Sequence, residues 1–327
     1  MNTNKEKLTC KKPLAIIIPI LMAAQAQSFE FYSGNIEGSF DSDISIGSSW
    51  RVENIDQDLA VDNNVDDSDR NYSNGDAFSQ IFKGSHSLSL SYQNYGAFVR
   101  GKYWYDSALE NNNVNHGSSS TATLAGNHGN TVTHEGGRID DSNFNDLSKF
   151  SGAEILDAFV YGSFDLGDMP LDVRLGKQVI SWGESTFIRG GINSINAIDV
   201  NAFTRAGAEV KEGLLPTNML FGSLGLSDNL NMEAFYLLDY QETVMPGCGT
   251  YFSPTDTVAE GCDLSTVKFY DTHIVRNEEG TRRPDSDGQF GFAMRYVIED
   301  LNDTEVSLYW KTQHSTTPNQ SGTQTNL

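Results

Sequence analysis

Cysteine, basic residues and long apolar runs are all scarce in this chain of 327 residues. The 3 cysteines are too few for a scaffold held together by many disulfides. Lysine and arginine total 22 against 44 aspartates and glutamates, and the resulting net charge of -22 argues against nucleic acid as a partner. No apolar run approaches the roughly 20 residues of a spanning helix, so a helical membrane protein is excluded.

The amino terminus has the features of an export signal. Several lysines precede an apolar run from Pro13 to Ala24, and Ala24-Gln25-Ala26 supplies the small-x-small pattern that a signal peptidase cleaves. The apolar run is about a dozen residues long, which is too short to cross a bilayer as a helix. We therefore predict a signal peptide over residues 1–26 and one exported domain over residues 27–327.

Cysteine placement agrees with export. Cys10 lies in the predicted signal peptide, which leaves Cys248 and Cys262 as the pair in the mature chain. In an exported protein two cysteines this close are expected to form a disulfide, closing a loop of roughly 15 residues for a gain of about 3 kcal/mol. Two free thiols or half of a metal site are the alternatives, although the nearest histidine, His273, stands alone.

Segments that alternate apolar and polar residues predict about nine strands. The contrast is clearest where Val99 and Tyr103 share one face and Arg100 and Lys102 share the other. The predicted strands cover approximately 40–52, 85–92, 95–106, 154–165, 171–181, 218–226, 230–240, 289–298 and 305–311.

The connections between these strands alternate in length. Tight turns such as Gln93-Asn94 alternate with long polar loops, so that every long loop is placed at the same end of the sheet. Soluble sandwiches also have period-two strands, but they have no reason to arrange their connections in this way. The sequence favours an all-β fold, a transmembrane antiparallel up-and-down β-barrel of the outer-membrane type.

The carboxyl end shows no final closing strand. An open sheet edge in hydrocarbon leaves unpaired backbone groups, each of which costs several kcal/mol, so a membrane barrel must close. We expect this chain to be an incomplete amino-terminal portion of a larger barrel, or else to need a partner chain.

The segment from Gly176 to Pro216 departs from the strand rhythm. It combines charges of both signs with large apolar residues, including Phe187, Ile195 and Phe203, which need something to bury against. We expect it to fold into the lumen as a constriction loop, and a solvated outer loop is the alternative. The side chains expected to form the constriction are Trp182, Glu184, Arg189, Asn193, Asn196, Asp199, Arg205, Glu209 and Lys211. Their expected lumen-facing partners on the strands are Arg100, Lys102, Asp157, Arg174, Glu233 and Arg295.

Enzyme motifs are missing from the sequence. The run GESTF at 183–187 ends in Phe where a nucleophile elbow needs Gly, and neither a phosphate-binding loop nor an HEXXH zinc motif is present. We therefore expect no catalytic residues, no cofactor and no metal.

Four runs carry a resemblance to a known family: GKQVISWGESTFIRGGINSIN, GAEVKEGLLP, SLGLSDNLNMEAFY and the paired-cysteine loop beginning CGTYFSPTD. They resemble a family of proteobacterial outer-membrane β-barrel proteins, the domain of unknown function 1302 family, over most of Phe29 to Trp310. The resemblance implies a barrel of roughly twice this length that handles hydrophobic or aromatic compounds or lipids. It supplies no catalytic or binding residue.

These features predict a porin-like channel in the outer membrane of a Gram-negative bacterium, for uptake or passage of hydrophobic or aromatic small molecules. The expected partners are outer-membrane lipid and lipopolysaccharide, the small-molecule cargo and a periplasmic protein. The alternatives are a structural or lipid-handling barrel that acts with periplasmic partners and, less favoured, a surface-exposed enzyme.

Overall fold

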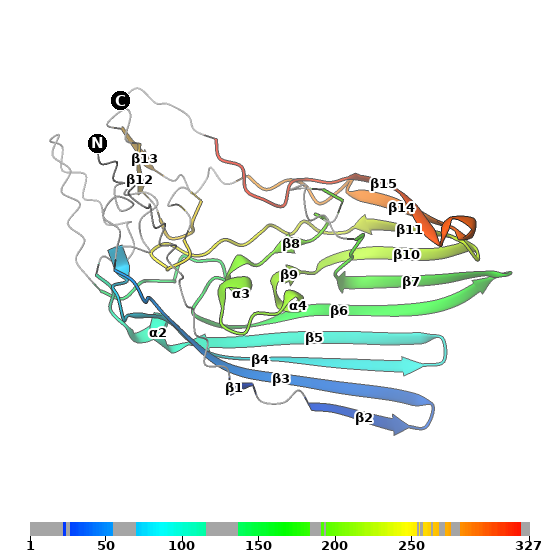
Figure 1. Ribbon diagram of the computed structural model, residues 1–327, viewed down its shortest axis with the longest axis horizontal. Helices are drawn as coiled ribbons and strands as arrows, with labels where there is room; N and C mark the ends of the chain where they lie inside the picture. Colours follow the sequence, from blue (N-terminus) through cyan, green and yellow to red (C-terminus); the bar gives the residue numbers. More distant parts are fainter. Residues whose placement is uncertain are drawn as a thin grey trace, which may run out of the picture.

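The protein is built around one large antiparallel sheet. The structure, a computed structural model, describes residues 22–23, 27–54, 70–115, 137–183, 191–192, 194–253, 255, 258–262, 264–267, 272–275 and 282–321. The sheet has the strand order β1-β3-β4-β5-β6-β7-β10-β11-β14-β15, and β2 also pairs with β3 (Figure 1). Most strands therefore pair with their neighbours in sequence, which confirms the predicted all-β antiparallel fold.

The strands of this sheet are β1 (Met22–Ala23), β2 (Gln27–Ser33), β3 (Ile36–Trp50), β4 (Ala77–Tyr92), β5 (Tyr95–Asp106), β6 (Ser151–Leu166), β7 (Met169–Gln178), β10 (Thr217–Ser227), β11 (Leu230–Leu237), β14 (Phe290–Ile298) and β15 (Thr304–Thr312). Two smaller pairs are β8 (Ala197–Ile198) with β9 (Leu214–Leu215), and β12 (Leu264–Val267) with β13 (Thr272–Val275). The short helices are α2 (Ser107–Asn111), α3 (Val200–Thr204), α4 (Val210–Gly213) and η3 (Glu299–Leu301). None of the helices in the described residues has the length and apolar character that crossing a membrane requires.

The predicted strands correspond to β3, β4, β5, β6, β7, β10, β11, β14 and β15, but the expected number was too low, because β1 and β2 extend the sheet to 11 strands. The strand β2 forms a hairpin with β3 around Gly34, whose φ of 65° favours glycine. The first predicted strand was also misplaced: β3 begins at Ile36 and ends at Trp50, so Val52 lies outside it. The second begins earlier than predicted, at Ala77.

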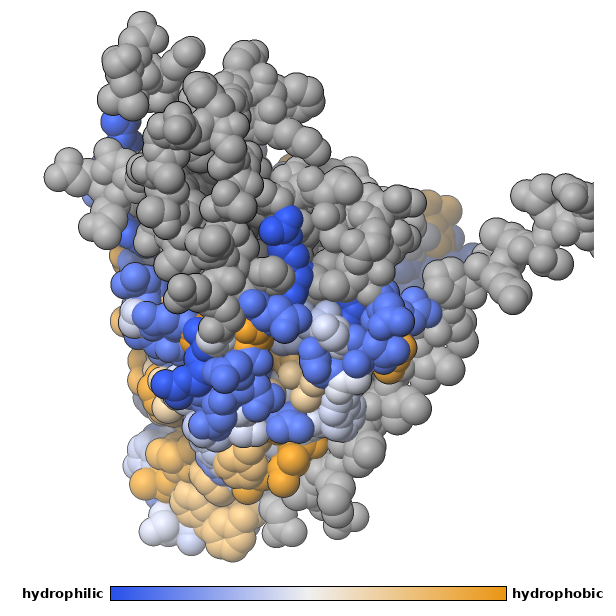
Figure 2. Space-filling model, turned by 90° about the vertical axis from the view of Figure 1, so that its left-hand side faces the viewer, coloured by the Kyte–Doolittle hydropathy of each residue, from blue (hydrophilic) through white to orange (hydrophobic). Residues whose placement is uncertain are grey.

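Connection lengths alternate as the sequence indicates. In Figure 1 the tight turns of the hairpins β2–β3, β4–β5, β6–β7, β10–β11 and β14–β15 lie at the right-hand end, and the long connections lie at the left. Figure 2 views the molecule from the long-connection end, where hydrophilic residues gather in the middle of the described surface and hydrophobic residues lie below them. The two ends of the sheet therefore differ in the length of their connections.

The two faces of the sheet also differ. The described parts of the connection from β7 to β10, residues 179–183, 191–192 and 194–216, lie against one face of the sheet. We name these described residues the inner segment and that face the inner face. Large apolar side chains remain exposed at alternate strand positions on the opposite, outer face. They include Phe40, Ile44, Ile46, Phe82, Tyr92, Tyr95, Val99, Tyr105, Ile155, Val160, Phe164, Leu175, Leu220, Tyr236, Phe290, Tyr296, Val306, Leu308 and Trp310.

The edges of the sheet are open. Within the described residues, β15 at one edge does not pair with β1 or β2 at the other. The described strands thus form an open sheet, and no closed barrel is present among them.

Candidate functional site: the inner segment and the inner face

The inner segment folds compactly over the middle of the sheet (Figure 1). The short strands β8 and β9 pair with each other, and α3 and α4 lie between them in sequence. Asp199 caps α3, because its side chain accepts a hydrogen bond from the Ala202 backbone N–H at 3.2 Å. The segment therefore has hydrogen bonds within itself in addition to its contacts with the sheet.

Two buried ion pairs fasten the inner segment to β4 and β5. Lys102 Nζ lies 2.8 Å from Asp199 Oδ2, and Lys83 Nζ lies 2.5 Å from Glu212 Oε2. Each lysine also donates to the segment's backbone: Lys102 to the Glu212 carbonyl at 3.1 Å, and Lys83 to the Gly207 carbonyl at 2.8 Å. Buried charges are costly unless they are paired and fully hydrogen-bonded, so these contacts fix the position of the segment.

A third attachment reaches β3. Lys211 Nζ lies 2.8 Å from Asp43 Oδ2 and also 2.8 Å from Glu209 Oε2, and all three side chains are partly exposed. Close by, Gly47 gives the segment room, because a Cβ on Gly47 would lie 2.4 Å from the Ala206 Cβ. The segment therefore approaches the β3 backbone as closely as a glycine allows.

Arg205 stacks on an inner-face aromatic side chain. Its guanidinium carbon lies 4.5 Å from the Trp104 ring centroid, and it donates to the Leu147 carbonyl at 3.1 Å. Loss of water lowers the pKa of Arg205, although the carboxylates of Asp199, Asp106 and Glu212 act in the opposite direction. Arg205 thus packs against the sheet as a flat cation.

The apolar part of the inner segment covers β10, β11 and β14. Trp182 is fully buried, and its ring centroid lies 5.0 Å from that of Phe235 and 5.9 Å from that of Tyr309. Asn196 donates to the Ile180 carbonyl at 2.6 Å and accepts from the Ile180 N–H at 3.2 Å. This part of the segment buries the cluster Ile180, Trp182, Ile195, Met219, Phe221, Phe235, Leu237 and Ala293.

The inner segment also contacts β15, through Ser194. Lys311 Nζ lies 2.8 Å from Ser194 Oγ, and Gln313 Nε2 donates to the Ser194 carbonyl at 2.9 Å. Together with the Lys211–Asp43 pair, these contacts mean that the inner segment crosses the inner face from β3 to β15.

The structure brings only some of the predicted partners together. Of the six strand residues expected to bond to the segment, only Lys102 does so within the described part of the chain. Among the described residues, four of the others form ion pairs between neighbouring strands: Arg100 pairs with Asp157, and Arg295 lies 2.6 Å from Glu233. The sixth, Arg174, packs on aromatic rings instead.

The structure describes six of the nine residues that were predicted to form the constriction. Trp182, Asn196, Asp199, Arg205, Glu209 and Lys211 occupy the positions given above. Glu184, Arg189 and Asn193 lie outside the described residues. Lys83 was not among the expected partners, because the second strand was predicted to begin at Ser85, two positions after this inward-facing lysine.

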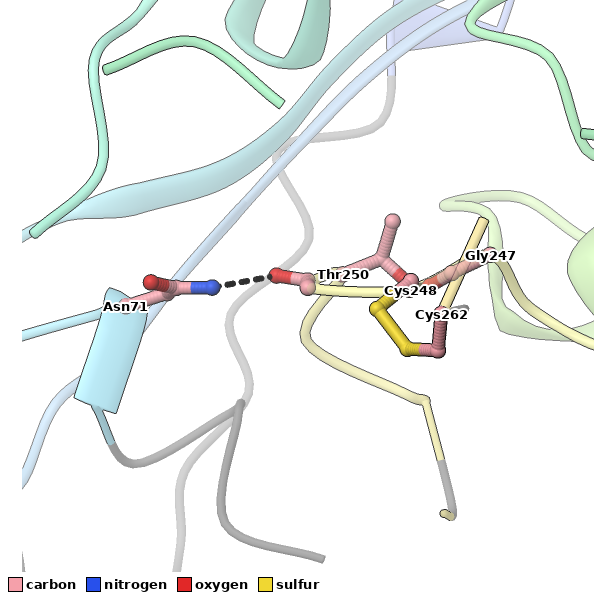
Figure 3. Close-up of a disulfide and its surroundings, with 6 residues drawn as sticks. Asn71, Gly247, Cys248, Thr250 and Cys262 are labelled. Atoms are coloured by element: carbon pink, nitrogen blue, oxygen red, sulfur yellow. Dashed lines mark hydrogen bonds between the residues drawn. A yellow bond between two sulfur atoms is a disulfide. The ribbon is translucent and has the colours of Figure 1, made fainter. Parts of the chain in front are cut away.

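Cys248 and Cys262 form a disulfide at the end of the molecule where the long connections lie, with their Cα atoms 5.3 Å apart. Phe144 packs against Gly247 and Gly261, where a Cβ would lie 1.9 Å and 2.3 Å from its ring. Asn71 donates to the Gly249 carbonyl at 2.8 Å, and its amide points toward the disulfide loop in Figure 3. The disulfide loop is thereby joined to the connection between β3 and β4.

The fold and the site together define an all-β protein whose outer face is apolar and whose inner face, with both charged and apolar side chains, is crossed by the inner segment. Among the described residues, no group of three or more His, Cys, Asp or Glu side chains could hold a metal ion. Residues 10–327 match the family described as "Protein of unknown function (DUF1302)", and the chain belongs to this family. No curated protein and no solved structure matches the chain significantly.

Proposed function

We propose that this chain forms the wall of an outer-membrane β-barrel that acts as a porin-like channel for hydrophobic or aromatic small molecules. The observation that carries the proposal is the outer face, where large apolar side chains are exposed at alternate positions on successive strands. An exposed apolar surface of this extent makes a water-soluble protein prone to association, whereas acyl chains cover the same surface in a bilayer.

The inner face supports a channel in particular. The residues that face away from the apolar surface include Arg100, Asp157, Arg174, Glu233 and Arg295, which suit a water-filled lumen. The inner segment crosses this face and is held by buried ion pairs, as a fixed constriction would be. In the proposed channel the segment sets the width of the path.

Closure and compartment belong to the same proposal. Because an open edge is costly in hydrocarbon, further strands from this polypeptide or from a partner chain would lie beside β2 and β15. The predicted signal peptide and the Cys248–Cys262 disulfide suit an exported protein of a Gram-negative outer membrane. Lipid and lipopolysaccharide would then surround the outer face.

A second candidate is a lipid-handling barrel that works with periplasmic proteins. A hollow of about 480 Å³ lies on the outer face near the tight turns, with Tyr92, Tyr95, Val160, Phe164 and Leu175 among its lining residues. The hollow is apolar, and it favours this candidate because an acyl chain could occupy it.

Planar-bilayer recording on the full chain, extracted from outer membranes with detergent, tests the channel. We expect discrete conductance steps, and larger steps from the double variant Lys83→Ala/Lys102→Ala, because the inner segment loses both buried attachments. The matched control is Arg283→Ala, which removes an exposed ion pair with Glu242 and should leave the step size unchanged. Membrane insertion without conductance would favour the lipid-handling barrel, and a protein soluble without detergent would reject both.

A further inference from the structure

Arg174 occupies an unusual position on the inner face. Its cross-strand neighbours are Tyr161 in β6 and Phe221 in β10. The guanidinium carbon lies 4.3 Å from the Phe221 ring centroid and 5.8 Å from the Phe159 ring centroid. A cation is therefore held between aromatic rings that come from the two adjacent strands.

The carboxylates around Arg174 are engaged by other groups. Asp157 pairs with Arg100, Glu233 lies 2.6 Å from Arg295, and Asp172 accepts a hydrogen bond from Ser163 Oγ at 2.5 Å. Within the described part of the chain, the Arg174 guanidinium forms no ion pair and donates no hydrogen bond. Its N–H groups, five in an arginine, are held in place by the rings but have no acceptor of their own.

Arg174 also lies at a boundary on the inner face. Phe221, on which it stacks, belongs to the cluster that the inner segment buries with Trp182 and Ile195. On the other side the aromatic surface continues from β6 to β5, because Phe159 lies 5.4 Å from Phe98, measured between ring centroids. Arg174 itself is only partly buried. A molecule that passes the segment along this face would meet the guanidinium and the rings together.

We propose that Arg174, with Phe159 and Phe221, forms a binding site for the carboxylate of a small aromatic acid. A guanidinium binds a carboxylate through two parallel N–H···O hydrogen bonds, and the neighbouring rings receive the apolar body of the same molecule. The chain has a net charge of -22, which repels an anionic cargo, and a local cation offsets this repulsion. This proposal rests on the proposed channel and names the chemical class of its cargo.

Calorimetric titration of the detergent-solubilised full chain with benzoate tests the site, and benzyl alcohol is the uncharged comparison. We expect benzoate to bind and Arg174→Gln to weaken it by about tenfold or more, since hydrogen bonds to a charged group are lost. Binding of benzyl alcohol should not change. Arg174→Lys, which keeps the charge but not the paired donors, should give an intermediate affinity.

The matched control is Arg283→Gln, which removes an exposed arginine far from the site in sequence. Circular dichroism establishes that each variant keeps its sheet. Unchanged benzoate affinity in Arg174→Gln, or an equal loss for both ligands, would overturn the carboxylate site. Conductance without an Arg174 effect rejects this site alone, whereas Arg174-dependent binding in a protein that does not conduct rejects the channel alone.

Discussion

Lys102 in β5 and Asp199 at the start of α3 are 97 residues apart in sequence, yet their Nζ and Oδ2 atoms lie 2.8 Å apart in the buried interior. The other carboxylate oxygen of Asp199 accepts the Ala202 N–H at 3.2 Å. One side chain therefore both begins the helix and fastens it to the sheet. The position of α3 depends on a lysine of the sheet.

Removal of that lysine should be strongly destabilising. In Lys102→Met the Asp199 carboxylate stays buried without its cation, which costs about 3–5 kcal/mol of unfolding free energy. Denaturant titration of refolded protein, followed by tryptophan fluorescence, measures the change. Arg283→Met is the control, because its partly exposed pair with Glu242 is worth about 0.2–1 kcal/mol. Equal losses in the two variants would contradict a fastening role for Lys102.

Gly47→Ala should displace the inner segment. The new Cβ would lie 2.4 Å from the Ala206 Cβ, and neither atom is the end of a flexible side chain. Overpacking of this kind costs about 1–3 kcal/mol, which the same denaturant titration measures. At Gly101, on the outer face, the nearest atoms to a new Cβ are 3.5 Å away, so Gly101→Ala should be tolerated. If both variants were neutral, the close approach of the segment to β3 would be refuted.

Loss of the disulfide should loosen the end of the molecule with the long connections. Replacing Cys248 and Cys262 together by serine opens a loop with a sequence separation of 14 residues. The chain-entropy argument gives a loss of about 3 kcal/mol. Limited proteolysis should then cut the disulfide loop faster, and chemical reduction of the unaltered protein should have the same effect. Unchanged cleavage would show that the packing of Phe144 holds the loop without the covalent bond.

An arginine substitution on the outer face distinguishes a face that contacts lipid from one that contacts water. Leu220 is 46% exposed, so in a soluble protein Leu220→Arg should change stability by no more than about 0.5 kcal/mol. In a membrane barrel the same change should cost about 2–4 kcal/mol near the bilayer midplane. The control is Ser223→Arg, which puts the charge on the inner face of the same strand. Unfolding from lipid vesicles measures both, and a neutral Leu220→Arg would argue against lipid contact.

Alternation in the sequence was sufficient to locate most strands of the sheet. Where polar and apolar residues alternate strictly, as in Tyr95–Asp106, the predicted and observed strands coincide. The strand β2 was missed because its short aromatic run follows directly after the predicted cleavage site. The start of β4 was missed because Ile81, Phe82 and Lys83 break the simple alternation.

The partners of the inner segment were harder to predict. Strand parity puts Arg100 and Lys102 on the same face, but only Lys102 lies far enough toward the long connections to meet Asp199. That position along the strand depends on where the segment settles, and local sequence does not encode it. The stacking of Arg174 depends likewise on the register of β7 against β10, which sets it opposite Phe221.

The inner segment contacts Asp43 in β3 and Lys311 in β15, and these two contacts constrain the order in which the protein can assemble. Most strands of the sheet add to a predecessor that has already been made, one hairpin after another, at little cost in chain entropy. The inner segment finds its last contacts, at Lys311 and Gln313, only after β15 has been synthesised and paired. The segment therefore completes its contacts only when β15 is in place, whereas its ion pairs with Lys83 and Lys102 require only β4 and β5.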